Sequence, residues 1–159
     1  MSNTLMKSNL DNAISVLAKL RQCAETMLSL VGQLQASIGV RDAKRQEELF
    51  GSDVYARFHA FTSDGHHAEP PSDGEWRELE SLFRAAFPRL YQLVAIDHDL
   101  TRDQLRLCLL VGLSFRHQVI MRVMDVDSNR VSRLKSQANK RLFGDKLAST
   151  LAVRLKDYV

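Results

Sequence analysis

SNRVSRLKSQANKRLF, the stretch from Ser128 to Phe143, has the pattern of a helix with two chemically different faces. At about 100° per residue, its apolar side chains share one narrow stripe, formed by Val131, Leu134, Ala138 and Leu142. The opposite face is polar and basic, and it comprises Asn129, Arg133, Ser136 and Lys140, flanked by Ser132 and Gln137. The pattern predicts a helix that docks on a core through one face and offers the other face to a polar, anionic partner.

The residues from Thr101 onward predict a buried helix beneath this one. Thr101 and Gln104 have the spacing of a capping box, in which each side chain satisfies a free backbone N–H at a helix start. The apolar residues that follow wrap most of the helix circumference, which is typical of a helix deep in a core. They are Leu105, Leu107, Cys108, Leu109, Leu110 and Val111.

A shorter amphipathic helix is predicted between these two, from Phe115 to Met124, with a turn at Asp125. Either Asp127 or Ser128 can cap the helix that follows, because both side chains can accept hydrogen bonds from first-turn N–H groups. A helix, a short helix, a tight turn and a polar-faced helix follow one another in the order of a helix-turn-helix.

Two groups of residues match a known family in type and spacing. The first comprises Leu100-Thr101, Leu105 to Cys108, Leu113 to Phe115, Ile120, Val126, Val131 and Lys140 to Gly144; the second comprises Ser52 to Tyr55, Phe58, Asp73 to Trp76 and Phe83 to Pro88. They resemble the C-terminal helix-turn-helix of Bacteroidetes transcriptional regulators, a domain similar to LuxR-type and sigma-factor region 4 domains. In that family the domain often follows tetratricopeptide repeats and a coiled coil.

The resemblance implies a sequence-specific DNA-binding transcriptional regulator, with the helix at 128–143 in the major groove of double-stranded DNA. There Asn129 can pair with adenine and Arg133 with guanine. Reading of base edges or phosphates is expected of Ser132, Ser136 and Gln137, and contacts to the backbone are expected of Arg130, Lys135, Lys140 and Arg141.

The excess of positive charge lies in the part of the chain that contains the predicted helix-turn-helix. Residues 1–100 hold 10 Lys and Arg against 14 Asp and Glu, whereas residues 101–159 hold 12 against 5, although the net charge of the whole chain is only +3. A basic cluster beside DNA releases counterions and gives salt-dependent binding.

Composition indicates a globular, cytoplasmic protein. Hydrophobic residues make up 45% and charged residues 26% of the 159-residue chain. No apolar run has the length of a membrane span, and the first residues lack the layout of a signal peptide. Cys23 and Cys108 fall in helical apolar patterns, which is typical of reduced, packed thiols; neither a disulfide nor a metal site is expected.

A long helix is predicted from Leu10 to Gly39, where the glycine is expected to end it. Its apolar residues recur at alternating spacings of three and four, interrupted at Arg21 and Gln35, and a second row of Leu20, Met27, Leu30 and Leu34 widens the apolar surface. Two interpretations stay open: an intramolecular bundle, or a homodimer seam formed by Ile14, Leu17, Ala24, Leu28, Val31 and Ile38.

The expected organisation is an all-α protein in three parts: a helical arm at 1–61, a loop at 62–72 and a helix-turn-helix domain without a wing at 73–159. His66 and His67 in the loop are interpreted as solvated histidines. A capping box at Ser72 to Glu75 starts a helix whose aromatic stripe is expected to be core, formed by Trp76, Phe83, Phe87 and Tyr91. The tail from Asp145 to Val159 is expected to form a last amphipathic helix.

Other classes of function receive less support. The five histidines are scattered, no nucleophile motif or glycine-rich phosphate loop is present, and neither an enzyme nor a cofactor is expected. The alternative to DNA binding is a protein-interaction module that contacts RNA polymerase or another regulator through the long N-terminal helix.

Overall fold

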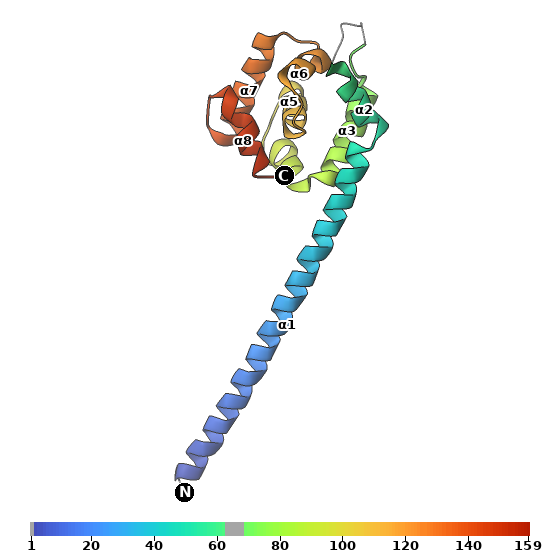
Figure 1. Ribbon diagram of the computed structural model, residues 1–159. Helices are drawn as coiled ribbons and strands as arrows, with labels where there is room; N and C mark the ends of the chain where they lie inside the picture. The colour runs from blue at the N-terminus through green and yellow to red at the C-terminus, as the bar shows by residue number, and fades with distance from the viewer. Residues whose placement is uncertain (1, 63–68) are drawn as a thin grey trace. The chain divides into compact units, whose positions relative to one another are not determined.

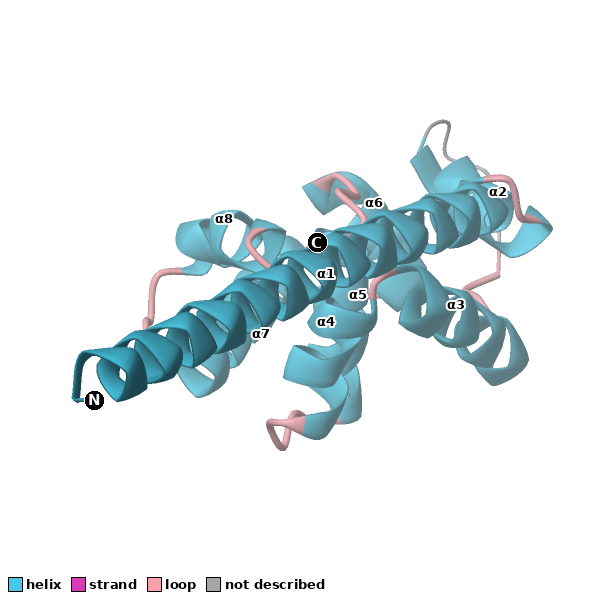
Figure 2. Ribbon diagram, turned by 90° about the horizontal axis from the view of Figure 1, so that it is seen from below, coloured by secondary structure: helices cyan, strands magenta, loops and turns pink. Residues whose placement is uncertain are grey.

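The computed structural model describes residues 2–62 and 69–159, and in these ranges the chain forms helices joined by turns and loops, with no strand (Figures 1 and 2). The predicted all-α class is therefore confirmed. The α-helices are α1 (Ser2–Phe50), α2 (Asp53–His59), α3 (Asp73–Ala86), α4 (Pro88–Tyr91), α5 (Arg102–Gly112), α6 (His117–Met124), α7 (Ser128–Phe143) and α8 (Leu151–Lys156). Short 3-10 turns lie at Ala60–Thr62 and Ala148–Thr150, and a π-helical turn lies at Gln92–Ile96.

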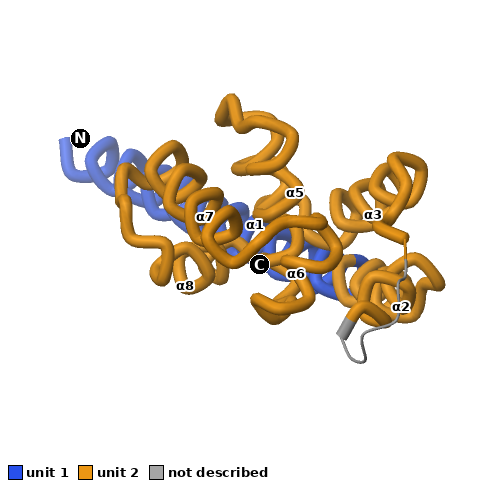
Figure 3. The backbone as a smooth tube through the Cα atoms, turned by 90° about the horizontal axis from the view of Figure 1, so that it is seen from above, with its two compact units in different colours: residues 1–41 blue, residues 42–159 orange. Residues whose placement is uncertain are grey.

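The chain divides into two compact units, Met1–Arg41 and Asp42–Val159 (Figure 3). The expected boundary was the loop at 62–72, but the last turns of α1 and the whole of α2 already belong to the second unit. The reason is packing, because their apolar side chains lie in the same core as α3. These side chains are Leu49, Val54 and Phe58, and Phe61 of the following 3-10 turn joins the same core.

Unit 1 is a single helix, the part of α1 from Ser2 to Arg41, and every described residue of it is exposed. The prediction that Gly39 ends this helix is wrong, since α1 continues to Phe50. A glycine inside a helix costs only about 1 kcal/mol relative to alanine. It therefore ends a helix only when other signals agree, and Val40 to Phe50 is itself helix-compatible.

The core of unit 2 is built around α5, as the sequence predicted. Leu107, Cys108, Leu109 and Leu110 are at most 1% exposed. The predicted capping box at the start of α5 is present: Gln104 N donates to Thr101 Oγ1 at 3.2 Å, and Thr101 N donates to Gln104 Oε1 at 3.1 Å. Both bonds satisfy N–H groups that a helix start otherwise leaves free.

The helix α3 begins and packs as its sequence predicts. Ser72 and Glu75 form the second capping box, with Glu75 N donating to Ser72 Oγ at 3.2 Å. Of the aromatic stripe, Trp76, Phe83 and Phe87 are buried and Tyr91 is half-buried. The stripe is therefore core. His66 and His67 lie outside the described residues.

The tail after α7 packs back on the unit 2 core, and the amphipathic helix predicted for it forms as α8 but covers only Leu151–Lys156. Leu151 and Leu155 of α8 are at most 1% exposed, and α8 contacts both α5 and α7. Within the described residues, no helix is long and apolar enough to cross a membrane.

Candidate nucleic-acid interface

The turn between α6 and α7 is short and tightly bonded. Asp125 has a left-handed backbone conformation, with φ 53° and ψ 52°, which short polar side chains such as Asp tolerate better than most. Val126 N then donates to Met121 O at 2.9 Å, and the Asp127 carboxylate accepts from Arg130 N at 2.7 Å. Asp127 is thus the residue that caps α7.

Ser128 has a different partner from the one that a capping role would give it. Its hydroxyl lies 2.8 Å from His117 Nε2 on α6, so it joins the first residues of the two helices. Burial, followed by the nearby charge of Lys135, lowers the pKa of His117 below its ordinary value. Burial also lowers the pKa of Lys135, which lies at the α6 side of α7.

The apolar stripe of α7 is buried as predicted. Val131, Leu134 and Ala138 are at most 1% exposed and Leu142 is 8% exposed. Contacts of this face with both α5 and α6 fix the rotation of α7 about its own axis. The opposite face is thereby held toward solvent.

Three predicted DNA-binding residues form the centre of this solvent face: Asn129, Arg133 and Lys140 lie within about 40° of one another around the helix. We call them the exposed stripe. Each is exposed, and none of the three side chains has a hydrogen bond or ion pair to another residue in the described part of the chain. Ser132 lies at one edge of the stripe and is also exposed. These side chains are free to contact another molecule.

Three others tie α7 to the start of α5 and to the segment just before it. Arg130 pairs with Asp103 at 3.6 Å, and Gln137 Oε1 accepts from Gln104 Nε2 at 3.4 Å. Arg141 donates to the backbone carbonyl of Asp99. These predicted DNA-binding residues therefore already have intramolecular partners, although Gln137 and Arg141 remain exposed.

The other edge of α7 is bonded to the tail. Ser136 Oγ donates to the carbonyl of Lys146 at 2.6 Å, so this predicted DNA-binding residue is half-buried by its own chain. Asn139, which the sequence did not single out, is fully buried and donates to Leu147 O at 2.7 Å and to Thr150 Oγ1 at 2.8 Å. Its only signal in the sequence is a polar amide beside the apolar stripe.

A hollow of about 540 Å³ lies beside the exposed stripe, between the start of α5 and the second half of α7. Lys140 and Arg141 place two positive charges on its wall. The rest of its lining is uncharged and comes from Thr101, Gln104 and Gln137. This part of the surface suits an anion.

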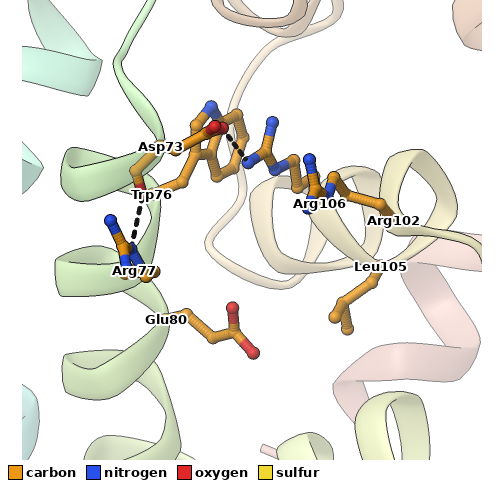
Figure 4. Close-up of a pocket in the computed structure, with 7 residues that line it drawn as sticks. All are labelled: Asp73, Trp76, Arg77, Glu80, Arg102, Leu105 and Arg106. Atoms are coloured by element: carbon orange, nitrogen blue, oxygen red, sulfur yellow. Dashed lines mark hydrogen bonds and ion pairs between the residues drawn. The ribbon is translucent and has the colours of Figure 1, made fainter.

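A second hollow, of about 440 Å³, lies between α3 and α5 (Figure 4). Arg106 spans it, pairing with Asp73 at 2.9 Å and lying 4.7 Å from the centre of the Trp76 ring. The hydrogen bond from Arg106, its charge and that of Arg102 lower the pKa of Asp73. Both partners of Arg106, the Asp73 carboxylate and the Trp76 ring, belong to α3, so these contacts join α3 to α5.

The residues predicted to form a dimer seam all lie in unit 1 and are exposed in the single chain. Ile14, Leu17, Leu28, Val31 and Ile38 range from 48% to 72% exposed, and Ala24 is also exposed. Among the residues that the structure describes, no group of three or more His, Cys, Asp or Glu side chains is arranged to hold a metal ion.

No protein-family model, curated protein or solved structure matches this chain. The chemistry and geometry of α7 and its surroundings are therefore what point to a function. The feature that needs explanation is the exposed stripe, since Ser136 and Gln137 of the same polar face have partners within the chain.

Proposed function

We propose that unit 2 binds double-stranded DNA, with α7 in the major groove, and that the protein is a sequence-specific transcriptional regulator. The observation that carries this proposal is the exposed stripe of Asn129, Arg133 and Lys140 on a helix whose other faces are fixed by packing and hydrogen bonds. Asparagine and arginine are the side chains that read adenine and guanine edges by paired hydrogen bonds.

The order of elements supports a helix-turn-helix. In such motifs the second helix of the pair enters the major groove and its first residues contact base edges, while the preceding helix crosses the backbone. By this assignment α6 is the crossing helix and α7 the recognition helix. Asn129 and Arg133 then lie in the first two turns of α7, where base contacts are made.

The positions of the charged residues along α7 support different DNA contacts for its two ends. Lys140 lies two turns beyond Arg133, beside the hollow that Arg141 also lines. A phosphate of the DNA backbone in this position would be neutralised by Lys140, so we assign phosphate contact to it and base contact to Asn129 and Arg133. Ser136, Arg130 and Gln137 take a smaller part, because their side chains have intramolecular partners.

The first experiment measures binding of the full chain to a fluorescently labelled random-sequence duplex by anisotropy across a salt series. The logarithm of the binding constant is expected to fall with the logarithm of salt concentration, with a slope of about 0.9 per neutralised phosphate. No binding at low salt would reject DNA binding and favour the protein-interaction module.

A second experiment tests the base-reading assignment on a duplex selected from a random library. Arg133→Ala is expected to weaken binding to the selected site by about 1 to 3 kcal/mol and to relax specificity at one base position. The matched control is Arg45→Ala, because Arg45 is also a helical, exposed arginine of unit 2 but lies on α1. Equal affinities for the two variants would remove Arg133 from the interface.

A further inference from the structure

An uninterrupted apolar repeat runs along unit 1. Residues at alternating spacings of four and three are apolar at every position; they are Met6, Leu10, Ala13, Leu17, Leu20, Ala24, Met27, Val31, Leu34 and Ile38. The row predicted from the sequence shares every second position with this one, but its other positions include Arg21 and Gln35. A spacing that averages 3.5 residues keeps one seam facing a neighbouring helix. The uninterrupted row is therefore the better seam.

Some of the positions on both sides of this seam are also apolar, whereas others, such as Arg21 and Gln35 on one edge and Ser37 on the other, are polar. Ile14 and Leu28 follow one edge and are 56% and 72% exposed, while Val16 and Leu30 follow the other and are 55% and 58% exposed. A strict two-position seam suits two helices, whereas a band this wide suits a bundle in which each helix meets more than one neighbour. The outermost face of the helix is polar instead, with Ser8, Ser15, Gln22 and Ser29.

The exposed area is large enough for a permanent interface. The chain has 11016 Å² of accessible surface, about 3,000 Å² more than the roughly 8,000 Å² expected for a folded monomer of its mass. Obligate interfaces bury about 2,000 to 5,000 Å² counted over both partners, or about 1,000 to 2,500 Å² per chain. The excess is therefore large enough for an obligate interface with further copies of this chain.

The charges of unit 1 favour a parallel arrangement. The apolar row runs from Met6 to Ile38 and has its midpoint at Gln22. In an antiparallel pair that overlaps along the whole row, Arg21 of one helix would therefore lie beside Arg21 of the other. Such like-charge pairs are costly at an interface. In a parallel pair, each residue at one edge of the seam faces a residue from the opposite edge of the neighbouring helix. Arg21 of one helix then faces Val16 of the other.

We infer that unit 1 assembles with at least two further copies of this chain into a parallel helical bundle whose seam is the uninterrupted row. The partners are further copies of this chain rather than an acidic or basic protein, because the band carries almost no charge to be complemented. The inference is independent of the proposed DNA binding, since the exposed stripe lies in unit 2. An isolated helix depends on such packing, because helices in water gain most of their stability from burying an apolar face.

The mass of the full chain in solution tests the stoichiometry. Light scattering coupled to gel filtration is expected to give at least three times the 18.0 kDa of one chain. The mass of a single chain would overturn the assembly, and that of two chains would overturn the stoichiometry.

Two adjacent substitutions test the seam. Leu34→Asp places a charge in the uninterrupted row and is expected to reduce the mass to that of one chain, whereas Gln35→Asp lies at the edge and is expected to leave it unchanged. The reverse result would favour the row through Arg21 and Gln35. Far-ultraviolet circular dichroism should show loss of helix in Leu34→Asp only, and continued protection of Cys108 from thiol reagents would show that unit 2 is still folded.

Cross-linking tests the orientation in a Cys23→Ser background. In a parallel bundle, Leu34→Cys places identical positions in contact, so a short bismaleimide is expected to link chains. Ser29→Cys, on the polar outer face, is the matched control and should remain unlinked. Failure of Leu34→Cys to cross-link in an assembly of unchanged mass would overturn the parallel arrangement.

Discussion

The side-chain amide of Asn139 donates to the carbonyl oxygen of Leu147 at 2.7 Å from a position with no solvent exposure. The same nitrogen donates to Thr150 Oγ1 at 2.8 Å. A buried amide therefore joins the middle of α7 to the segment that precedes α8. This contact fixes the edge of α7 next to the exposed stripe.

Replacing this amide should destabilise unit 2. Asn139→Ala removes both bonds and leaves the Leu147 carbonyl without this donor, so we expect the free energy of unfolding to fall by about 1 to 3 kcal/mol. Urea denaturation followed by circular dichroism measures the change. Ser149→Ala is the control, because Ser149 is an exposed side chain of the same segment. Equal stabilities of the two variants would contradict a structural role for the amide.

The Asp145 carboxylate should make the tail sensitive to acid. Its hydrogen bond from Leu147 N at 3.0 Å, followed by that from Thr150 Oγ1 and the pairing with Arg154, holds the pKa of Asp145 below its ordinary value of 3.8. A lowered pKa in the folded state stabilises the protein above the unfolded-state pKa, and this stabilisation is lost as the pH falls through the folded-state pKa.

Asp145→Asn is therefore expected to lower the urea midpoint near neutral pH, and the difference from the unchanged protein should shrink below about pH 4. Midpoints measured across that range test the linkage. A difference that is the same at every pH would show that the charge of Asp145 does not contribute.

The Cys108 thiol should be protected from modification by the folded state. Cys108 is fully buried in α5, and burial raises its pKa to about 12, so little reactive thiolate forms near neutral pH. In a Cys23→Ser variant, a maleimide should label the protein only after urea is added. Labelling of the native variant at the rate of a free thiol would mean that the α5 core opens readily.

Lys140 should contribute to DNA affinity without contributing to specificity. As a phosphate contact, its replacement by alanine is expected to reduce the slope of the salt dependence by about 0.9 and to weaken random and selected duplexes equally. The comparison is Lys19→Ala, which removes an exposed lysine from unit 1. A larger loss on the selected duplex would instead assign base reading to Lys140.

Local signals predicted much of the fold. The capping boxes at Ser72 and Thr101 and the buried stripe of α7 depend on residues a few positions apart, so the sequence was sufficient to predict them. The glycine signal at Gly39 failed because its cost is small compared with the helix-compatible residues on either side. The division into units depends on packing of Leu49 and Phe58 against α3, a non-local contact.

The candidate interface was predictable only in part. The residues of the polar face follow from helical periodicity, but which of them have intramolecular partners depends on segments far away in the chain. Arg141 is bonded to Asp99 and Ser136 to Lys146, and neither pair has a recognisable spacing. Asn139 was missed for the same reason, because its partners become visible only when the tail folds back.

Trp76, which packs against Arg106, gives unit 2 a tryptophan fluorescence signal that unit 1 lacks. Trp76 is the single tryptophan of the chain and is 4% exposed. Its intrinsic emission therefore reports the junction of α3 and α5 and contains no signal from a tryptophan in unit 1. Tryptophan emission reports the unfolding of unit 2, whereas far-ultraviolet ellipticity reports the loss of helix in both units. Recording both signals during one urea titration would therefore separate the unfolding of one unit from that of the other.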